Sequence, residues 1–403
     1  MNHPASRSRV VVAALAASAL LPFTGCTYSE PPYQGWTTEA VAVADLNRDL
    51  SADILSATSV FDQSAFLPGY LTVRLQSRVS PGTFNGPIRT PTCLDPEALA
   101  LGDLDGDGRL DVAVACGAAS GTSYEVGVHL QLASPPGTFG TAGLLSTGAA
   151  RPSAIRLADL DGDGRLDLIV GASSGTKLLL FFQQPSPAAT GTFASPVTLD
   201  IGAAPVAVAA GDLTGAGRID LVATTADGRV VVLLHDPAPG SFLPGVSYPA
   251  GLYPVAVEIA DLDGDGHPDL LMADASGSLL VMAQLAGGGD FDPVVAHDVF
   301  DWATRALSVA DLDGDGRLDV AVASAGPPGW PGSEAVFMQA PAPAPPGRLL
   351  PPTLYTGYQG PLSIVAADVD DDLRPDLVIA DGLASIRYQE PGGHFLPPVW
   401  LRQ

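Results

Sequence analysis

The run DLDGDGRLD stands at Asp103–Asp111, recurs at Asp159–Asp167 and Asp311–Asp319, and returns as DLDGDGHPD at Asp261–Asp269. Aspartates occupy positions 1, 3, 5 and 9 of each copy, and glycines occupy positions 4 and 6. The run is too short for a helix, and glycine permits the positive φ angles that allow neighbouring carboxylates to converge. We therefore expect each copy to be a loop that suits a hard cation.

Three fainter copies extend the pattern along the chain. They read DLNRDLSAD at 45–53, DLTGAGRID at 212–220 and DVDDDLRPD at 368–376. The seven first aspartates stand at residues 45, 103, 159, 212, 261, 311 and 368, which divides the chain into near-equal units. A regular internal period is the mark of a repeat architecture and overrides a domain count based on the 403-residue length. We predict a single domain built from seven repeats.

Acidity is concentrated in these loops. The formal net charge is −25, and 26 of the 44 acidic residues lie in the seven loops. Bound cations would offset much of that charge, so the composition says little about a basic partner. It argues against nucleic acid, whose phosphates the chain would repel.

The N-terminal residues 1–25 have the features of a secretory signal. Arg7 and Arg9 precede an apolar run from Val10 to Leu21, which is too short to remain as a membrane-spanning helix. Small residues directly before Cys26 resemble the lipobox of bacterial lipoproteins, although Phe23 stands where leucine is usual.

That resemblance implies cleavage before Cys26 and lipidation of its thiol, with residues 26–36 as a tether. We accordingly expect an exported protein that is anchored to a bacterial membrane through lipid alone, at the outer membrane or cell surface. Ordinary signal cleavage near Ala16–Ala19, with an incidental cysteine, is the alternative.

Two further cysteines, Cys93 and Cys116, are 23 residues apart and flank the acidic loop of the second unit, to which we assign both. An exported protein can form disulfides. A hairpin register centred on Asp107 places Cys116 opposite Ala98, so a bridge requires the chain before Ala98 to fold back. Pairing and its absence both remain open at this point.

Each unit also repeats a pattern of short apolar runs. In the third unit the run at 154–158 leads into the acidic loop, and Leu168–Val170 leaves it. A Gly/Ser turn precedes a third run at 177–183, and a Gly-Thr-Phe turn ending at Phe193 starts a fourth. The pattern predicts an all-β chain of four-stranded units.

Seven such units fit the blades of a closed β-propeller, in which each sheet packs between two neighbours. A linear solenoid is the rival architecture, but it requires polar capping units, and the first and last units here look like the others. We predict one seven-bladed β-propeller over residues 37–403. Its units begin near residues 37, 95, 151, 204, 253, 303 and 360.

These residues resemble the FG-GAP/VCBS repeats, which form the blades of integrin α-subunit propellers and of many secreted bacterial proteins. The resemblance spans roughly Thr37 to Leu401 and depends on the acidic loops and the Gly-Thr-Phe turns. It implies the propeller fold and a scaffold or adhesive module, and it leaves the activity open because a fold does not determine a function.

The donor set favours calcium over magnesium, because it offers side-chain oxygens at positions 1, 3, 5 and 9 and a backbone carbonyl at position 7. An EF-hand is excluded, since position 12 holds strand residues such as Val114 instead of glutamate. Aspartate and glycine also favour turns, but crowded like charges in four copies favour a cation. The predicted ligands are Asp103, Asp105, Asp107, Arg109, Asp111, Asp159, Asp161, Asp163, Arg165, Asp167, Asp261, Asp263, Asp265, His267, Asp269, Asp311, Asp313, Asp315, Arg317, Asp319, Asp368, Asp370, Asp372, Arg374 and Asp376.

We thus expect four to five structural Ca²⁺ sites. The seventh unit retains its carboxylates but has Leu373 in place of the second glycine. The first unit has Asn47 at position 3 and lacks both glycines, so a site there remains open. The fourth unit has Thr214 and Ala216 in place of two ligands, and we expect no metal there.

A partner is expected on the face opposite the acidic loops, where the chain crosses between units. Large aromatic residues and arginines on loops of a rigid ring are typical of recognition surfaces. The alternative is that they pack between units or cap the central channel. The candidates are Trp36, Arg151, Tyr253, Trp302, Arg305 and Tyr358.

No catalytic spacing of nucleophile, acid and base is evident. His129 and His235 lie at or beside a third-run position that otherwise holds glutamine, and we interpret them as structural. The sequence favours a monomeric, calcium-stabilised lipoprotein at the cell surface or in the periplasm, which acts as a binding, adhesion or scaffold module for a protein or polysaccharide. The alternative is a carbohydrate-active enzyme on the same scaffold, because glycosidase carboxylates have no local signature.

Overall fold

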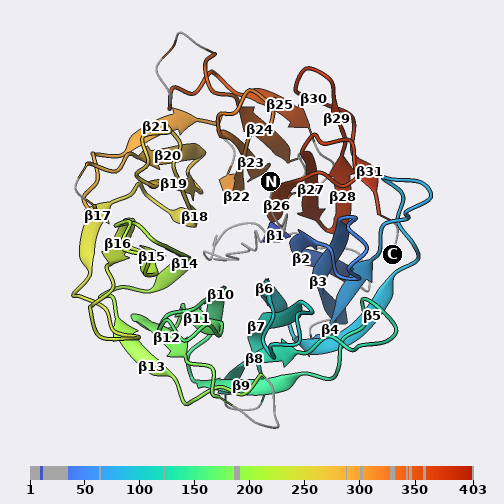
Figure 1. Cartoon of the computed structure of the whole chain (residues 1–403), viewed down its shortest axis with the longest axis horizontal. Coiled ribbons are helices and arrows are strands. Elements are labelled where there is room, and N and C mark those ends of the chain that lie inside the picture. The colour runs from blue at the N-terminus through green and yellow to red at the C-terminus, as the bar shows by residue number, and fades with distance from the viewer. Residues whose placement is uncertain are drawn as a thin grey trace, which may run out of the picture.

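The computed structural model describes residues 10–11, 35–62, 65–120, 123–185, 191–286, 288–299, 303–326, 332–341, 344, 347–356 and 360–401. Seven antiparallel sheets, each dominated by four consecutive strands, are arranged as blades around a central axis (Figure 1). The described residues contain no helix. The predicted all-β, seven-bladed propeller is confirmed.

The strands of each blade run from the axis to the rim in chain order, except at the end of the seventh. Blade 1 contains β2 (Gly35–Ala44), β3 (Asp53–Asp62), β4 (Ala65–Arg74) and β5 (Ile88–Leu94). Blade 2 contains β6 (Pro96–Gly102), β7 (Asp111–Ser120), β8 (Ser123–His129) and β9 (Gly143–Gly148). Blade 3 contains β10 (Pro152–Ala158), β11 (Asp167–Ala172), β12 (Lys177–Phe181) and β13 (Val197–Asp200). Blade 4 contains β14 (Pro205–Gly211), β15 (Asp220–Thr225), β16 (Arg229–Leu233) and β17 (Val246–Pro249).

The remaining blades follow the same plan. Blade 5 contains β18 (Pro254–Ala260), β19 (Asp269–Asp274), β20 (Ser278–Met282) and β21 (Val295–Asp298). Blade 6 contains β22 (Ala303–Ala310), β23 (Asp319–Ala325), β24 (Ser333–Phe337) and β25 (Thr353–Thr356). Blade 7 contains β26 (Ser363–Ala367), β27 (Asp376–Asp381), β28 (Leu383–Arg387) and β31 (Val399–Trp400), with a small hairpin of β29 (Gln389–Glu390) and β30 (His394–Phe395) beside it. A short β1 (Val10–Val11) pairs with Ala44 and Val43 on the inner edge of β2.

The alternation of strand directions puts two kinds of connection on opposite faces of the ring. The acidic loops and the Gly-Thr-Phe turns share one face, which we call the metal-loop face. The turns between second and third strands share the other face with the crossings between blades, and we call it the crossing face. The candidate cation sites and the candidate partner residues that the structure describes therefore lie on opposite sides of the molecule.

The core consists of aliphatic side chains packed between neighbouring blades. Both faces of an inner strand are covered, so β6 is buried along its whole length. At the joint between blades 7 and 1, Val41, Val43 and Ile54 pack with Val365 and Val378. Complete burial of side chains of this size contributes about 1.5–3 kcal/mol each. Apolar packing thus continues across the two ends of the chain.

Polar contacts at that joint add to the packing. The backbone N–H of Thr38 donates to the carbonyl of Gly382 at 3.1 Å. Arg74 Nη2 donates to the carbonyl of Leu401, the last described residue, at 3.4 Å. Tyr388 Oη donates to the carbonyl of Gly82 at 2.5 Å. Blade 7 consists of C-terminal strands alone, so blades 1 and 7 meet by packing and hydrogen bonding.

A disulfide joins blade 1 to blade 2. Cys93 lies in β5, the rim strand of blade 1, and its sulfur is 2.05 Å from that of Cys116 in β7. Our assignment of both cysteines to the second unit is therefore wrong. A bulge between Pro96 and Ala98 also shifts the register, so that Cys116 faces Pro96 instead of Ala98.

Candidate metal centres

All seven acidic loops adopt one backbone conformation. Positions 4 and 6 have positive φ angles in every loop, including those without glycine. Five loops have glycine at both positions, where this conformation carries no steric cost. Blades 1 and 7 instead place Arg48, Leu50, Asp371 and Leu373 at φ angles between 60° and 73°. The conformation is thus fixed by the pattern of contacts as well as by glycine.

The aspartate at position 1 organises the loop. In blade 2, Asp103 accepts the N–H of Gly106 at 2.7 Å through Oδ1 and that of Gly108 at 2.8 Å through Oδ2. The bond from the position 6 N–H recurs in all seven loops, at 2.7–3.0 Å. Because it is present in loops with and without a complete carboxylate set, it is a feature of the fold.

The aspartate at position 9 pins three segments of its blade together. In blade 2, Asp111 accepts the N–H of Leu104 at 2.8 Å and the N–H of Gln131 at 2.7 Å, one on each carboxylate oxygen. The same pair of bonds occurs in all seven blades. We expected this residue only as a cation ligand; its recurrence in blade 4, as Asp220, shows a structural role.

Burial is the main cause of the raised pKa values at position 9. Burial raises the pKa to about 6 in Asp111, Asp167, Asp269 and Asp319. The two backbone N–H donors oppose this rise, because they favour the charged carboxylate. Neighbouring loop carboxylates raise these pKa values further. A nearby cation would reverse that repulsion.

Carboxylates converge in five of the loops. In each, three aspartates offer oxygens that lie within 4.8 Å of one another. The five groups are Asp103, Asp105 and Asp111; Asp159, Asp161 and Asp167; Asp261, Asp263 and Asp265; Asp311, Asp313 and Asp315; and Asp368, Asp370 and Asp376. They belong to blades 2, 3, 5, 6 and 7.

Position 5 divides these loops into two kinds. In blades 2, 3 and 7 its carboxylate forms an ion pair with the arginine at position 7, as between Asp107 and Arg109. The aspartates at position 9 complete the groups there. In blades 5 and 6 the position 5 aspartates, Asp265 and Asp315, belong to the groups. The position 9 aspartates, Asp269 and Asp319, do not. The structure thus brings together three of the four predicted aspartates in each loop.

The position 7 residues contribute other contacts. The backbone N–H groups of Arg109, Arg165, His267, Arg317 and Arg374 donate to the position 5 carboxylate at 2.8–2.9 Å. Their proposed role as carbonyl ligands stays a prediction.

The loops of blades 1 and 4 form no group of three carboxylates among the described residues. In blade 4, Thr214 and Ala216 leave Asp212 and Asp220 as the loop's acids. In blade 1, Asn47 and Asp49 remain beside Asp45, and both Asp45 and Asn47 accept the N–H of Asp49 at 2.9 Å.

The five groups fit a calcium ion in donor chemistry. They offer hard oxygens alone, in irregular loops partly open to water, and calcium accepts six to eight such ligands. At these distances the like charges repel each other unless protons or a cation intervene. In blades 2, 3 and 7 the ion would be held by side chains on both sides of the hairpin, and in blades 5 and 6 by the loop aspartates at positions 1, 3 and 5. Any further ligands would come from water or backbone.

A ring of glutamines connects the metal loops of neighbouring blades. In blade 2, Gln131 Nε2 donates to the carbonyl of Leu46 in the loop of blade 1, at 2.8 Å. Equivalent bonds are made by Gln76, Gln183, Gln284, Gln339 and Gln389 to the position 2 carbonyls of Val369, Leu104, Leu213, Leu262 and Leu312. Blade 4 has His235 at this position, whose Nδ1 contacts the carbonyl of Ile219 in its own blade at 3.2 Å. Our structural interpretation of His235 agrees with this contact.

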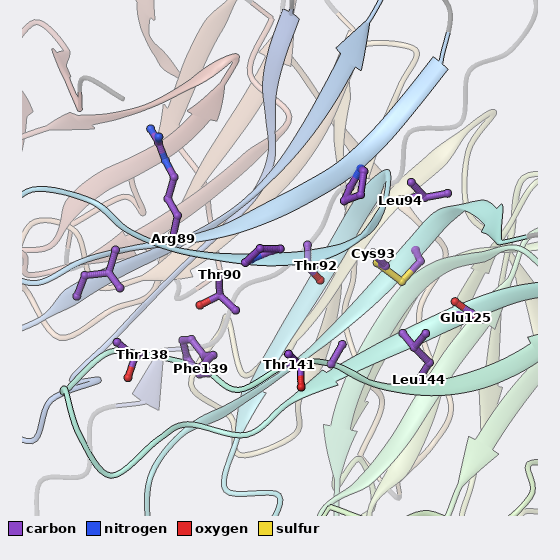
Figure 2. A pocket seen from close by; sticks show the side chains of 15 residues that line it. Arg89, Thr90, Thr92, Cys93, Leu94, Glu125, Thr138, Phe139, Thr141 and Leu144 are labelled. Carbon is purple, nitrogen blue, oxygen red and sulfur yellow. A yellow bond between two sulfur atoms is a disulfide. The ribbon is translucent and has the colours of Figure 1, made fainter.

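A hollow of about 550 Å³ lies beside the disulfide, between β5 and the segment 138–144 of blade 2 (Figure 2). Thr92 lines this hollow, and its Oγ1 is 2.9 Å from Nε2 of the buried His129, whose Nδ1 is 2.9 Å from the carbonyl oxygen of Gly140. Burial lowers the pKa of His129, so Nδ1 donates to the carbonyl and Nε2 accepts from the threonine. The histidine therefore serves as a polar link between blades 1 and 2.

The predicted partner residues have varied environments. Tyr253 is 46% exposed on the crossing face. Arg151 is instead held by an ion pair with Glu97 and by a bond from its Nε to the carbonyl of Gly117 at 3.0 Å. Arg305 Nε is buried and has no hydrogen-bond partner, and burial lowers its pKa.

Two of the six residues, Trp302 and Tyr358, lie outside the described residues, and so does Cys26. Trp36 belongs to β2 and its backbone pairs with Val60. Most of the segment 57–70 belongs to a hairpin formed by β3 and β4 on the same face.

A buried polar cluster lies between blades 6 and 7. Arg387 donates to Glu334 Oε2 through Nε at 2.9 Å and through Nη2 at 2.8 Å. Both side chains are buried. Asp381 lies nearby, and its Oδ1 accepts no hydrogen bond. Burial first, and then the charge of Glu334, raises the pKa of Asp381 to about 8.

Comparison with known proteins agrees with this architecture. Among solved structures, the chain is similar to BBS1N in crystal structures of its complex with ARL6DN. The match to the mercury-soaked crystal has a TM-score of 0.52 and 12% identity, and covers 91% of this chain and 92% of that one. The match to the lead-soaked crystal has a TM-score of 0.52 and 13% identity, and covers 86% and 89%. At this identity the likeness shows the fold alone.

No curated protein matches the sequence. No helix in the part of the chain that the structure describes is long and apolar enough to cross a bilayer. The model of the FG-GAP-like repeat matches residues 103–170, 159–223, 212–272 and 261–322, and thus more than half of the chain. Each match begins at the first aspartate of an acidic loop and ends in the second strand of the next blade. The chain therefore belongs to the family of FG-GAP-like repeat proteins.

Proposed function

We propose that this protein is an exported, lipid-anchored binding module whose ring is stiffened by about five calcium ions. The observation that carries the proposal is the recurrence of three converging carboxylates at one place in five blades, the hairpin between the first and second strands. A propeller with these loops is consistent with a scaffold, and the proposed anchor at Cys26 rests on the resemblance of the preceding residues to a lipobox.

Calcium would act on stability. An ion bound between the first two strands adds its binding free energy to that of the folded hairpin. At a free concentration 100 times the dissociation constant, each site contributes about 2.7 kcal/mol. The loops of blades 1 and 4 would rely on hydrogen bonds alone.

A protein or glycan partner is proposed for the crossing face. Tyr253 supports this, since a half-exposed tyrosine on a loop of a rigid ring supplies contact area at low entropic cost. BBS1N, to which the chain is similar in fold, is itself found in a complex with a protein, ARL6DN.

The test is a binding and activity screen of the full chain in calcium, on a glycan array, on protein fractions from the cell surface, and on a polysaccharide panel for turnover. Tyr253→Ala should weaken binding at least tenfold. Val246→Ala, which changes a half-exposed side chain on the rim strand β17, should leave it unchanged. Turnover of a polysaccharide that is lost with one exposed aspartate outside the acidic loops would replace this proposal with the enzymatic alternative.

A further inference from the structure

Two neighbouring acidic loops depart from the others in the same way. Positions 4 and 6 hold Arg48 and Leu50 in blade 1, and Asp371 and Leu373 in blade 7, where the other five loops have glycine. Their φ angles are 60°, 73°, 61° and 70°. A side chain with a Cβ atom adopts this region at a steric cost that glycine avoids. The chain bears that cost four times at one joint of the ring.

The residues at position 6 are also the most exposed leucines of the described chain. Leu50 is 88% exposed and Leu373 is 74% exposed. Both line one hollow of about 740 Å³ on the metal-loop face, between the loops of blades 1, 6 and 7. Apolar groups also contribute to its wall: Ala44, Ala52, Ala310, Leu312, Ala366 and Pro375. Two exposed leucines thus flank a depression that is apolar in part.

Hydrogen bonds within and between the two loops order the backbone that carries the leucines. Ser51, next to Leu50, donates through Oγ to Oδ2 of Asp371 at 3.4 Å. The N–H groups of Leu50 and Leu373 donate to Asp45 and Asp368 at 2.8 and 2.9 Å. Because this backbone is already ordered, a partner pays no entropic cost for ordering the loops when it binds.

The rim of the hollow is acidic. Asp45 and Asp371 line it and belong to none of the five carboxylate groups, so calcium in those groups leaves their charges in place. Arg374 is a lining cation, and it forms an ion pair with Asp372 of its own loop. The hollow therefore combines apolar side chains with the negative charges of Asp45 and Asp371.

We propose that this hollow, on the face opposite Tyr253, docks a protein segment that presents an apolar side chain flanked by lysine or arginine. The apolar side chain packs between Leu50 and Leu373, and the basic groups face Asp45 and Asp371. Charge complementarity selects this occupant over a lipid surface, whose anionic headgroups these aspartates would repel. The inference adds a second interaction surface to the proposed function.

The test begins with a displayed library of random 12-residue peptides, selected on the full chain in millimolar calcium. Enriched peptides are then synthesised, and their affinities are measured by fluorescence anisotropy. We expect an apolar residue beside lysine or arginine in the enriched set, and weaker binding at higher salt. The double variant Leu50→Gly/Leu373→Gly should lose at least tenfold in affinity. Because glycine fits positive φ, its melting temperature should be equal or higher, so that lost binding is not a folding defect.

The matched control is Leu252→Gly, which removes a 67% exposed leucine from the crossing face and should leave peptide affinity unchanged. Asp371→Asn should weaken binding and reduce its salt dependence. Equal affinity for the double glycine variant, or an enriched set without basic residues, overturns the proposal. Leucine-dependent binding to vesicles of neutral phosphatidylcholine, without peptide binding, would replace it with a lipid site.

Failure of this proposal is distinguishable from failure of the proposed function. Peptides that lose binding in Tyr253→Ala and retain it in the double glycine variant would place recognition on the crossing face alone. A selection that enriches no peptide overturns the hollow as a protein-docking site, whatever the crossing face binds in the glycan and protein screens.

Discussion

Gln76 Nε2 in blade 1 lies 2.6 Å from the carbonyl oxygen of Val369 in blade 7, to which it donates a hydrogen bond. These residues are 293 positions apart in the sequence. The same bond connects five other pairs of neighbouring blades, so the joint between the chain ends is made like an internal joint. The ring is closed by a repeated polar contact together with the aliphatic packing around Val41 and Val365.

Gln76→Ala should therefore destabilise the ring. The carbonyl of Val369 is buried with its neighbours, and loss of its donor costs about 1–3 kcal/mol. Urea unfolding followed by circular dichroism measures the change. An unfolding free energy equal to that of the parent would show that the closing bond contributes nothing.

His235→Gln should have the opposite effect. Blade 4 has histidine where six blades have glutamine, and a glutamine there is expected to donate to the position 2 carbonyl of Leu160 in blade 3. One such bond is worth about 0.5–1.5 kcal/mol. The lost edge contact between His235 and Phe242 and the lost bond from His235 Nδ1 to the carbonyl of Ile219 oppose part of that gain. A variant that is less stable than the parent would contradict the role of this position in joining neighbouring blades.

Two substitutions separate the structural aspartate from the ligand aspartates. Asp220→Ala in blade 4 leaves the buried N–H groups of Leu213 and His235 without acceptors, so it should lower the melting temperature equally in calcium and in EDTA. Asp161→Ala in blade 3 should reduce the calcium stoichiometry by one and lower the melting temperature mainly in calcium. Differential scanning calorimetry in both buffers makes the comparison, and a calcium-dependent effect of Asp220→Ala would contradict it.

Asp381 should make stability fall as the pH rises. Its pKa is raised from an ordinary value of 3.8 to about 8, so the folded state retains a proton that the unfolded chain loses. The titration of Asp381 therefore leaves the free energy of unfolding unchanged below about pH 4. Between about pH 4 and pH 8 it lowers that free energy by at most about 1.4 kcal/mol per pH unit, and above about pH 8 its effect is constant. The groups facing it are Glu334, Arg387 and Ser385.

Asp381→Asn removes this titration and retains the shape of the side chain. The stability of the variant relative to the parent should grow between pH 5 and pH 8, as measured by urea unfolding at fixed ionic strength. Parallel curves for the two proteins over this range would rule out a protonated Asp381.

The disulfide should contribute about 2–4 kcal/mol, since it closes a loop across 23 residues and ties the rim of blade 1 to blade 2. The double variant Cys93→Ser/Cys116→Ser should lose that amount in non-reducing urea unfolding. Addition of a reducing agent should destabilise the parent by a similar amount and leave the variant unaffected. A parent that is insensitive to reduction would contradict the contribution.

The repeat made the blade count, the strand order and the acidic loops predictable from sequence. Each loop carries its own signal, because Asp103 and Gly108 are five residues apart and contact each other directly. Contacts between blades carry no such signal. The recurring glutamine of the third strand is visible in the sequence, but nothing in the sequence near Gln76 indicates Val369 as its acceptor. Cys93 was misassigned for the same reason, since its strand pairs with β4 while its sulfur bonds to the next blade.

The dual role of the position 9 aspartate was also hidden. A carboxylate at the end of an acidic run is consistent with a ligand, and only the buried N–H groups of Leu104 and Gln131 identify the second role of Asp111. A signal did exist in the sequence: blade 4 retains Asp220 although it has lost two other acids. A position preserved in a degenerate loop indicates a task independent of the cation.

Equilibrium dialysis of the full chain against calcium, with bound metal counted per chain and melting curves recorded in parallel, tests the central claim most directly. We predict about five ions per chain, a lower melting temperature in EDTA, and its recovery when calcium returns. A chain that binds no calcium at millimolar concentration, with the same melting curve in EDTA, would contradict the account.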